Sequence, residues 1–554
     1  MYHSPLIFVA VYSLNSHMNL RIVILSIVSG LLLWLSWPTM PFTPLIFIAL
    51  TPLFYITEKV KHRGAYFGLI FLAFLIWNAG STWWVGNTPV PVSGVFANSF
   101  NAFLMTIPWL MYKNSRRRLS ATTSFFALIV YWLTFEYIHQ TWELSWPWLV
   151  LGNAFAMHPG WVQWYEITGA SGGTVWVLLT NILIYAAWKR ARIHDLSVSE
   201  IGKKEIWKPA LVVLLPLLAN LFIHPVADDP SKQINVVVVQ PNIDPYDEKF
   251  AGGNSMQQVE KLLRLSGEKT DSNTRYIIWP ETALFPQGGW EEQLNYTPEI
   301  TAIREFLRKH PQAKIISGAV TLKQYRQPDE AAEGSRAMED GTRWDAFNSA
   351  LQIDTSNAIQ IYHKYELVPG VELVPYVRYL NFMKKLALDM GGITGSYGRT
   401  PASEMLTDPA HNINVFPTIC YESVFSNYVA NRARAGANML VIITNDGWWG
   451  NTDGHRQHMQ YARLRAIETR KWIARSANTG ISAVVDPYGN IYQPQPYWEP
   501  AVFKAPVTPR YDTTFYVKYG DLISKGAIIF CILLLIHAIF SRFIPGISNV
   551  ENNQ

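Results

Sequence analysis

Long apolar segments recur through the first part of the chain and return once near its end. Each is close to the ~20 residues that a helix needs to cross about 30 Å of hydrocarbon. They cover residues 20–37, 44–57, 65–84, 92–112, 121–139, 164–188, 207–223 and 522–543. The pattern predicts eight membrane-spanning helices, seven before a long polar region and one after it, although the second run is short.

Basic residues occupy every second connection between these runs. Residues 59–63, 113–118 and 189–208 are rich in Lys and Arg, whereas residues 38–43, 85–91 and 140–163 contain neither. Basic loops remain in the cytoplasm. We therefore expect a cytoplasmic N-terminus and, after seven crossings, a polar region on the periplasmic side of a bacterial inner membrane. Core helices of a large soluble protein would not show this alternation.

The composition supports a chain that is partly embedded in lipid. Of its 554 residues, 14% are aromatic and only 16% are charged, and the mean hydropathy is slightly positive. Soluble domains contain about 25% charged residues. The net charge of +5 is modest for this length. No basic tract with interleaved aromatic residues is present, so we expect no nucleic-acid partner.

The polar region alternates strand-like and helix-like stretches. Continuous apolar, β-branched runs predict buried strands; they lie at residues 234–240, 274–280, 313–320, 346–354, 413–420, 438–445 and 481–490. Helical periodicity is found at residues 257–265, 298–309 and 455–475. This is the pattern of a layered α/β domain. The predicted units are a short N-terminal segment (1–19), a membrane domain with seven helices (20–223), the α/β domain (224–518) and a transmembrane helix with a tail (519–554).

Three apolar strands of this region end in a polar residue that a plain core would not require. "WPETA" places Glu281 there, "YHKYE" places Lys364, and "TICYES" places Cys420. Strand ends are where α/β folds present catalytic groups. Taken singly, each has an ordinary explanation: a capping carboxylate, a lysine that reaches solvent, and a small buried apolar residue. Together they supply a base, a cation and a nucleophile.

A cysteine nucleophile needs a base or a nearby positive charge, because its free thiol has a pKa of about 8.5. His363 adjoins Lys364 and is expected on the opposite face of an extended strand. His455 and His458 lie three residues apart on a predicted helix, a weak zinc signal without a second ligand pair. A carboxylate is therefore the predicted base. We expect no metal and no organic cofactor.

The order Glu, Lys, Cys in the contexts "WPETA", "HKYELVPGVELVP" and "CYES" resembles the nitrilase (carbon-nitrogen hydrolase) superfamily. With seven apolar runs and "SWPWLVLGN" before it and one run after it, the chain is similar to the membrane-bound apolipoprotein N-acyltransferases over nearly its whole length. The resemblance implies an αββα sandwich joined to a multi-pass helical domain. It implies Glu281 as general base, Lys364 as oxyanion stabiliser, Cys420 as nucleophile, and Glu372, Tyr421 and Glu422 as supporting or substrate-binding residues.

The reaction implied by the resemblance moves a fatty acyl chain from a phospholipid to the N-terminal α-amine of the diacylglyceryl-cysteine of an apolipoprotein. It passes through a thioester on Cys420 in a ping-pong cycle and is the last step of lipoprotein maturation. The expected partners are the phospholipid donor, the apolipoprotein acceptor and the membrane, and a monomer is expected. Two departures from the family pattern concern the lid and substrate contacts: Gly370-Val371 replaces the usual Phe-Gly, and Phe250 replaces a loop tryptophan.

Two other functions remain open from the sequence. A membrane-tethered amidase or nitrilase would share the triad, but one anchor would suffice for it. A transporter or receptor with an outer ligand-binding domain should carry charged residues within its spans, and few are present apart from Glu136, Glu143 and Glu166 near the ends of the runs. Acylation of Cys420 from a labelled phospholipid separates an enzyme from a receptor. Transfer to a peptide amine instead of water separates an acyltransferase from an amidase.

Overall fold

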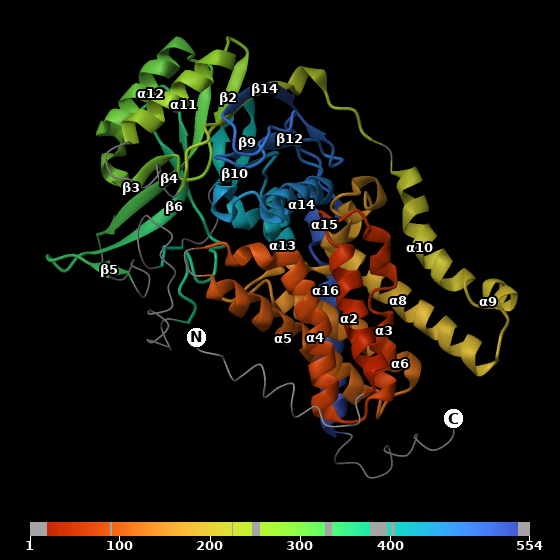
Figure 1. Ribbon diagram of the computed structural model, residues 1–554. Coiled ribbons are helices and arrows are strands. Elements are labelled where there is room, and N and C mark those ends of the chain that lie inside the picture. Colours follow the sequence, from red (N-terminus) through yellow and green to blue (C-terminus); the bar gives the residue numbers. More distant parts are fainter. Residues whose placement is uncertain are drawn as a thin grey trace.

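The computed structural model describes residues 19–88, 91–223, 225–245, 255–326, 335–376, 396–399 and 405–540. An α/β part is stacked on one end of a helical part (Figure 1). Phe250, most of the predicted N-terminal segment and the tail beyond residue 540 lie outside the described residues.

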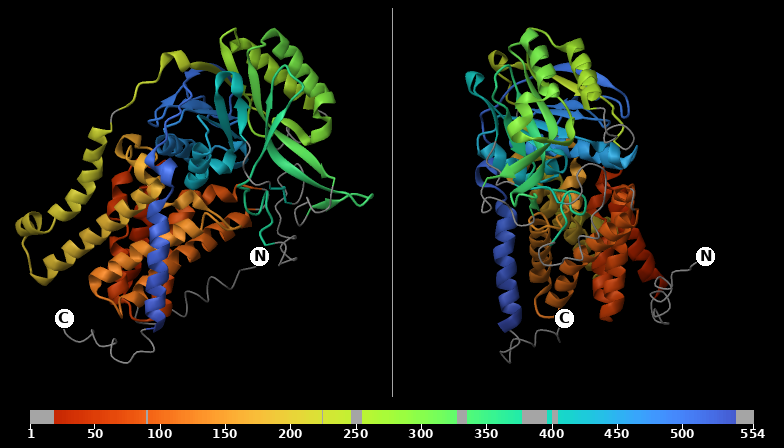
Figure 2. Two further views of the ribbon diagram at one scale, coloured as in Figure 1. Left: turned by 180° about the vertical axis from the view of Figure 1, so that it is seen from behind. Right: turned by 90° about the vertical axis from the view of Figure 1, so that its left-hand side faces the viewer.

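The helical part is a bundle of mostly apolar helices, and the C-terminal helix α16 packs beside α6 in it (Figure 2). Its principal helices are α2 (Leu20–Leu35), α3 (Thr51–Lys59), α4 (Arg63–Thr82), α5 (Val92–Ser115), α6 (Ala121–Ile138), α8 (Ala170–Ile193), α10 (Trp207–Ala219) and α16 (Leu522–Phe540). Among the described residues, four helical segments are long and apolar enough to cross a membrane: 63–86, 121–138, 170–193 and 522–540. Two shorter apolar helices begin at Leu20 and Trp207. The predicted membrane domain is therefore supported, whereas the number of eight spans is supported only in part.

Two of the predicted spans differ in detail from the helices observed. The run at 44–57 is split into a 3₁₀ turn (Thr43–Phe47) and α3. The run at 164–188 is broken at Gly169, which has a φ of +63°, so that α8 begins only at Ala170. Glycine adopts this conformation without steric cost. A Cβ at Gly169 would also lie 2.4 Å from the ring of Tyr516, so the close approach of the two segments requires the glycine.

Two sheets pack face to face in the α/β part. One has the order β14-β1-β2-β4-β6-β5, with β3 beside β4 and β7 beside β6, and the other has the order β13-β12-β11-β10-β9-β8. Helices α11 (Ser255–Lys269) and α12 (Pro298–Lys309) cover the first sheet, and α13 (Ser426–Arg434) and α14 (Asp453–Thr469) lie between the second sheet and the helical part (Figure 1). This is the αββα arrangement that the resemblance implies.

Each of the seven predicted apolar runs contains a strand, although the run at 481–490 does so only over Ala483–Val485, and β3, β5, β7, β8, β11, β13 and β14 were not predicted. Their bounds are β1 (Ile234–Gln240), β2 (Thr274–Ile278), β3 (Leu284–Trp290), β4 (Lys314–Tyr325), β5 (Arg336–Ala337), β6 (Arg343–Ile353), β7 (Gln360–His363), β8 (Leu406–Asp408), β9 (Ile413–Ile419), β10 (Met439–Thr444), β11 (Ile473–Ala477), β12 (Ala483–Val485), β13 (Ile491–Tyr492) and β14 (Ala501–Val507). The predicted helix at 455–475 is wrong at its end. Arg470 has a left-handed φ of +52° and ends α14, and the next apolar residues form β11, since a short buried strand and a buried helix have similar patterns.

Strand direction brings the candidate residues to common edges. β1, β2 and β4 are parallel, and β7 runs in the same direction as β4 because two antiparallel pairings separate them. In the second sheet β9, β10 and β11 are parallel. Glu281 and Lys364 thus follow strands of one sheet at the same edge, and Cys420 follows β9 of the other.

A continuous hydrophobic core joins the helical part to the α/β part. Tyr461 of α14 lies at their junction: its hydroxyl accepts a hydrogen bond from Trp37 Nε1 (3.1 Å) and donates one to the carbonyl of Trp148 (2.9 Å). The α/β part is therefore packed on the helices and held there by hydrogen bonds that cross the junction.

Candidate active site

Cys420 begins a sharp turn directly after β9. Its φ of +49° lies in the left-handed region, which non-glycine residues adopt uncommonly and at a cost of about 1–3 kcal/mol. A short 3₁₀ helix (Cys420–Val424) follows at once, and the side chain is 8% exposed. A strained turn between a strand and a helix is the geometry by which several hydrolases present a nucleophile.

Glu281 follows β2 in an equally unusual backbone. The next residue, Thr282, has a φ of +46°. Gly318 of β4 makes this path possible, because a Cβ at Gly318 would lie 2.5 Å from the Cα of Glu281. The Gly318 N–H also donates to the Pro280 carbonyl (3.0 Å). A larger residue at position 318 would displace the carboxylate from the site.

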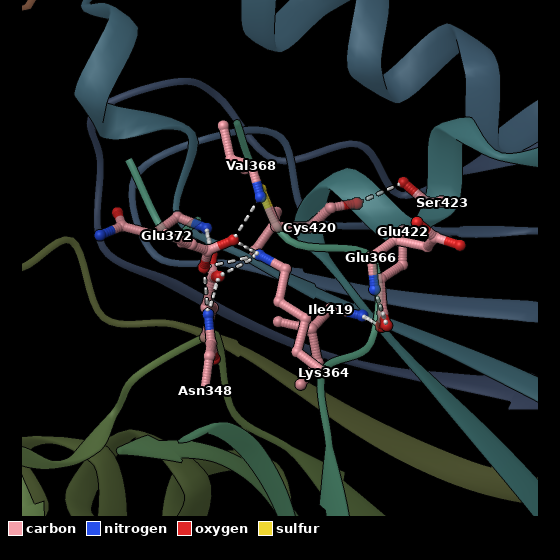
Figure 3. A network of polar contacts seen from close by, with 12 residues as sticks. Asn348, Lys364, Glu366, Val368, Glu372, Ile419, Cys420, Glu422 and Ser423 are labelled. Carbon is pink, nitrogen blue, oxygen red and sulfur yellow. Dashed lines mark hydrogen bonds and ion pairs between the residues drawn. The ribbon is translucent and has the colours of Figure 1, made fainter. Parts of the chain in front are cut away.

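Lys364 lies between two carboxylates and beside Cys420 (Figure 3). Its Nζ is 2.9 Å from a carboxylate oxygen of Glu372 and 3.4 Å from Glu281 Oε1. Asn348 Nδ2 donates to both carboxylates, at 2.8 Å each. All these side chains are buried. The charge-assisted bonds hold the ammonium and both carboxylates in one arrangement.

The remaining oxygen of each carboxylate accepts a backbone N–H. Glu281 Oε2 accepts from Asn445, the residue directly after β10 (2.9 Å), and Glu372 Oε2 accepts from Val368 (2.9 Å). Because β10 belongs to the second sheet, Glu281 is held by both sheets at once. The site is thus built across the interface of the sandwich.

The electrostatics favour a charged lysine and a neutral resting thiol. Burial lowers the pKa of Lys364, but the carboxylates of Glu372 and Glu281 outweigh this effect and hold the pKa above its ordinary value. Burial raises the pKa of the Cys420 thiol well above its usual range, and the Glu281 carboxylate raises it further, while the Lys364 ammonium opposes the rise. The thiol therefore rests protonated, and a reaction of its sulfur would require a base, which the Glu281 carboxylate can supply.

We expect Cys420 to react with iodoacetamide more slowly than free cysteine throughout pH 7–9, because its raised pKa keeps the thiol protonated and its side chain is buried. The measurement is the rate of carbamidomethylation of Cys420 by peptide mass spectrometry, with glutathione as reference. Rapid alkylation with an inflection below pH 7 would instead indicate a stable thiolate.

Comparison with known proteins agrees with this geometry. Residues 235–512, about half of the chain, match the family model of the carbon-nitrogen hydrolases. The chain belongs to the carbon-nitrogen hydrolase family. Residues 29–183 match a second model, described as the apolipoprotein N-acyltransferase N-terminal domain.

Full-length relatives of this carbon-nitrogen hydrolase carry the same name as the second model. The apolipoprotein N-acyltransferase of Chlorobaculum tepidum is 29% identical over 542 residues, which are 94% of this chain and 97% of the relative. That of Geobacter metallireducens is 26% identical over 524 residues, 92% of this chain and 93% of the relative. A solved structure of a nitrilase-superfamily member from Saccharomyces cerevisiae is 15% identical, with a TM-score of 0.34, and the match covers 50% of this chain and 91% of that one.

Glu422 of this carbon-nitrogen hydrolase joins the Lys364 segment to the Cys420 turn. The carboxylate is fully buried. Its Oε1 accepts from Tyr362 Oη (2.7 Å) and from the Tyr365 N–H (2.8 Å), and its Oε2 accepts from the Ile419 N–H (2.8 Å). One side chain thus fixes the residue after Lys364 and the residue before Cys420.

Tyr421 joins the same turn to the helical part. Its hydroxyl donates to the Ser145 carbonyl (2.8 Å), and its ring stacks with Trp146 at 6.1 Å between centroids. Ser145 and Trp146 belong to the loop after α6, within the motif "SWPWLVLGN". Trp449, in the aromatic "GWWG" segment, packs against Trp84. The helical part therefore contributes directly to the surroundings of Cys420.

A buried polar network behind Cys420 was not anticipated from the sequence. His458 Nε2 lies 3.1 Å from the Cys420 carbonyl oxygen and 2.7 Å from Ser423 Oγ. His458 Nδ1 lies 2.9 Å from Asp446 Oδ1, and Arg475 pairs with the other oxygen of Asp446 at 2.5 Å. Burial acts to raise the pKa of Asp446, but His458 and Arg475 outweigh it and hold the pKa well below its usual range. Through His458, the network holds the strained turn at the Cys420 carbonyl and at Ser423.

Cys420 Sγ, an Asp446 oxygen and a His458 ring nitrogen lie within 4.8 Å of one another. This set resembles a metal site in residue type, but both ring nitrogens of His458 and both oxygens of Asp446 already have protein partners. A metal would have to displace these bonds. The predicted neighbour His455 stacks on Tyr497 instead, and His363 lies 2.7 Å from Glu291 Oε1, so neither joins this set.

Asn445, Asp446 and Asn348 were not predicted as site residues, although their sequence context resembles that of Glu281 and Cys420. Asn445 and Asp446 follow the continuously apolar strand β10, just as Cys420 follows β9. Asn348 is a polar residue within the apolar stretch "AFNSALQ" of β6. A polar residue at the end or in the middle of a buried strand requires a partner, and here the partners are the other residues of the site.

Proposed function

We propose that this protein transfers a fatty acyl chain from a phospholipid to the N-terminal α-amine of the diacylglyceryl-cysteine of apolipoproteins. The observation that carries the proposal is the meeting of Cys420, Glu281 and Lys364 in one buried site at the junction with an apolar helical part. The names of the full-length relatives describe N-acylation of apolipoproteins, and both parts of the chain match the corresponding models.

In the first half of the reaction, Glu281 takes the proton of Cys420 as the sulfur attacks the ester carbonyl of the phospholipid. The tetrahedral oxyanion forms beside the Lys364 ammonium, whose charge the neighbouring carboxylates maintain. Glu281 then gives the proton to the departing lysophospholipid oxygen. Cys420 is left as a thioester, and Glu281 returns to the carboxylate form.

In the second half, the α-amine of the acceptor attacks the thioester, and Glu281 removes a proton from the amine. The second tetrahedral intermediate again places its negative oxygen beside Lys364. Its collapse releases the N-acyl product, and Glu281 gives the amine proton to the departing sulfur, which restores the Cys420 thiol and the Glu281 carboxylate. Glu372 and Glu422 act through other residues: Glu372 holds Lys364, and Glu422 holds the Cys420 turn. Such a cycle is ping-pong and requires no metal or organic cofactor.

The lipid nature of both substrates explains the association with apolar helices. Withdrawing acyl chains into water costs about 0.8 kcal/mol per CH₂, so the reaction must take place at the bilayer surface. Lys113 and Arg116 lie at the C-terminal end of α5, and Arg190 and Arg192 lie at the C-terminal end of α8, in two of the basic connections of the alternating charge pattern. By the positive-inside rule, these observations favour a multi-pass bacterial inner-membrane protein with a periplasmic α/β domain.

The test uses the full-length protein in detergent micelles. After incubation with a phospholipid that carries a labelled acyl chain, intact-mass and peptide analysis should find the label on Cys420 as a hydroxylamine-sensitive thioester. Addition of a diacylglyceryl lipopeptide with a free α-amine should transfer the label to the peptide. Cys420→Ala should carry no label.

Labelling that persists in Cys420→Ala would contradict the proposal. Release of the acyl group to water, without transfer to the lipopeptide under any condition, would favour the membrane-tethered amidase. Absence of labelling in the wild-type protein, with intact binding of the lipopeptide, would favour a receptor.

A further inference from the structure

Ser423, His458 and Asp446 have the spacing of a Ser-His-Asp triad, but the serine is not presented as a nucleophile. Ser423 Oγ lies 2.7 Å from His458 Nε2, and His458 Nδ1 lies 2.9 Å from Asp446 Oδ1. The Ser423 hydroxyl donates to the Cys420 carbonyl oxygen at 2.7 Å, and all three side chains are buried. In a triad the histidine takes the serine proton. His458 therefore has a different role here.

Both ring nitrogens of His458 face oxygen atoms that need a hydrogen from the ring. Nδ1 faces the Asp446 carboxylate, which only accepts. Nε2 faces the Cys420 carbonyl oxygen at 3.1 Å and the Ser423 oxygen, whose own hydrogen is directed to that carbonyl. A neutral imidazole carries one N–H, so either neutral tautomer would leave a short contact between two acceptors. Only the doubly protonated imidazolium gives every one of these contacts a hydrogen.

The charged groups in contact with His458, among the residues that the structure describes, are Asp446 and Arg475. Arg475 pairs with Asp446 Oδ2 at 2.5 Å and lies farther from His458 Nδ1, at 3.2 Å. Burial acts to raise the pKa of Asp446, but His458 and Arg475 hold it well below its usual range. With an imidazolium, the cluster of Asp446, Arg475 and His458 contains one anion and two cations. Its net charge is then positive.

Two tryptophan rings border the histidine and are compatible with a positive charge on it. The ring centroid of Trp148, in the helical part, lies 5.8 Å from that of His458, and the ring centroid of Trp449 lies 6.1 Å from it. Indole rings attract cations at distances of about 6 Å. The surroundings of His458 thus combine one carboxylate with aromatic rings.

The cluster lies close enough to the sulfur to act on its charge. A His458 ring nitrogen, an Asp446 oxygen and Cys420 Sγ lie within 4.8 Å of one another. In the resting site, burial and the Glu281 carboxylate raise the pKa of the thiol most, and Asp446 adds to the rise. Once Glu281 has taken the thiol proton, its own negative charge is gone. The sulfur anion then has the Lys364 ammonium and the positive cluster among its neighbours.

We propose that His458 is held as an imidazolium at neutral pH and that its charge stabilises the anion that develops on Cys420 Sγ during attack; the second half rests on the proposed function. His458 is a positioning residue, because it acts through Cys420. Its Nε2 holds the carbonyl of the strained turn, and its charge offsets that of Asp446. A neutral histidine would leave the cluster without net charge.

The first experiment measures the protonation of His458 directly. The full-length protein in detergent is labelled with ¹⁵N in the histidine rings, and the His458 resonances are assigned from the difference between wild type and His458→Gln. Both ring nitrogens should show protonated resonances from pH 6 to pH 8.5. If His458→Gln does not fold, Ser423→Ala gives the assignment, since it removes the hydroxyl at Nε2. An unprotonated ring nitrogen at pH 7.5 overturns the proposal.

The second experiment measures the effect of the charge on the sulfur. Alkylation of Cys420 by iodoacetamide at pH 9 should be about tenfold slower in His458→Gln, since loss of a nearby cation lowers the thiolate fraction. Loosening of the turn alone would have the opposite effect, because it would expose the thiol. His455→Gln is the matched control: this buried histidine lies on the same helix and stacks on Tyr497. It should keep the wild-type rate within a few-fold.

The same variants test the catalytic half. Single-turnover thioester formation from labelled phospholipid should fall about tenfold or more in His458→Gln, with the half-saturating phospholipid concentration unchanged. Unchanged or faster alkylation and unchanged thioester formation in a folded His458→Gln overturn the proposal and leave the proposed function standing. Absence of the thioester in wild type overturns the proposed function, whereas the resonances and the alkylation rates still decide the charge of His458.

Discussion

Glu281→Gln should slow thioester formation on Cys420 by about three orders of magnitude, because general acid–base catalysis typically contributes roughly 10²–10⁴-fold. The amide cannot take the proton of a thiol whose pKa is raised. It still fills the same volume, and its oxygen can accept from either Asn348 or Asn445. The measurement is the single-turnover rate with labelled phospholipid.

A matched control for this variant is Glu291→Gln. Glu291 is also largely buried and contacts His363 and Thr321, but it lies outside the site. Its substitution should leave the rate within a few-fold of wild type. If Glu281→Gln retained more than about a tenth of the wild-type rate, another group would have to be the base.

Lys364→Met should damage both activity and stability. Loss of one oxyanion-stabilising group costs about 10²–10³ in rate. The change also leaves the carboxylates of Glu281 and Glu372 buried together without a cation, and breaking a buried ion pair in this way costs about 3–5 kcal/mol of unfolding free energy. Thermal unfolding in detergent and the single-turnover rate measure the two effects separately.

Two further variants separate the effect of Lys364→Met on catalysis from its effect on stability. Lys364→Met/Glu372→Gln removes one of the unpaired carboxylates and should regain part of the stability without regaining activity. Lys471→Met removes another buried lysine, whose ammonium donates to the Arg510 and Asp512 carbonyls, and should lower stability while the folded protein still forms the thioester. Recovery of activity in the first variant would exclude Lys364 from the reaction.

The sequence carried enough information for the layers of the fold and for the central residues of the candidate site. Buried parallel strands are continuously apolar, so β1, β9 and β10 could be located nearly to the residue, and a polar residue directly after a predicted strand identified Glu281 and Cys420. Both signals are local. They depend on a few consecutive residues and on no knowledge of which strands are neighbours.

The parts that could not be predicted depend on contacts between distant segments. Asn348 is ordinary in β6 until the fold places it between Glu281 and Glu372. His458 lies 38 residues after Cys420 and reaches it only because α14 packs against the 3₁₀ turn. The break before α8 depends on the ring of Tyr516, more than 300 residues away. A hydropathy pattern likewise gives the number of apolar runs, but it does not show which runs form one uninterrupted helix.

The hydrogen bond from Tyr421 to Ser145 has a practical consequence for handling the protein. Ser145 lies in a loop whose position depends on how α6 and its neighbours pack. A detergent that loosens those helices should therefore displace Tyr421, the residue after Cys420, before it unfolds either sheet. Loss of turnover should then precede loss of the far-ultraviolet circular dichroism signal, and adding lipid back should restore it. A comparison of detergents therefore tests how strongly the packing of the helical part affects the site in the α/β part.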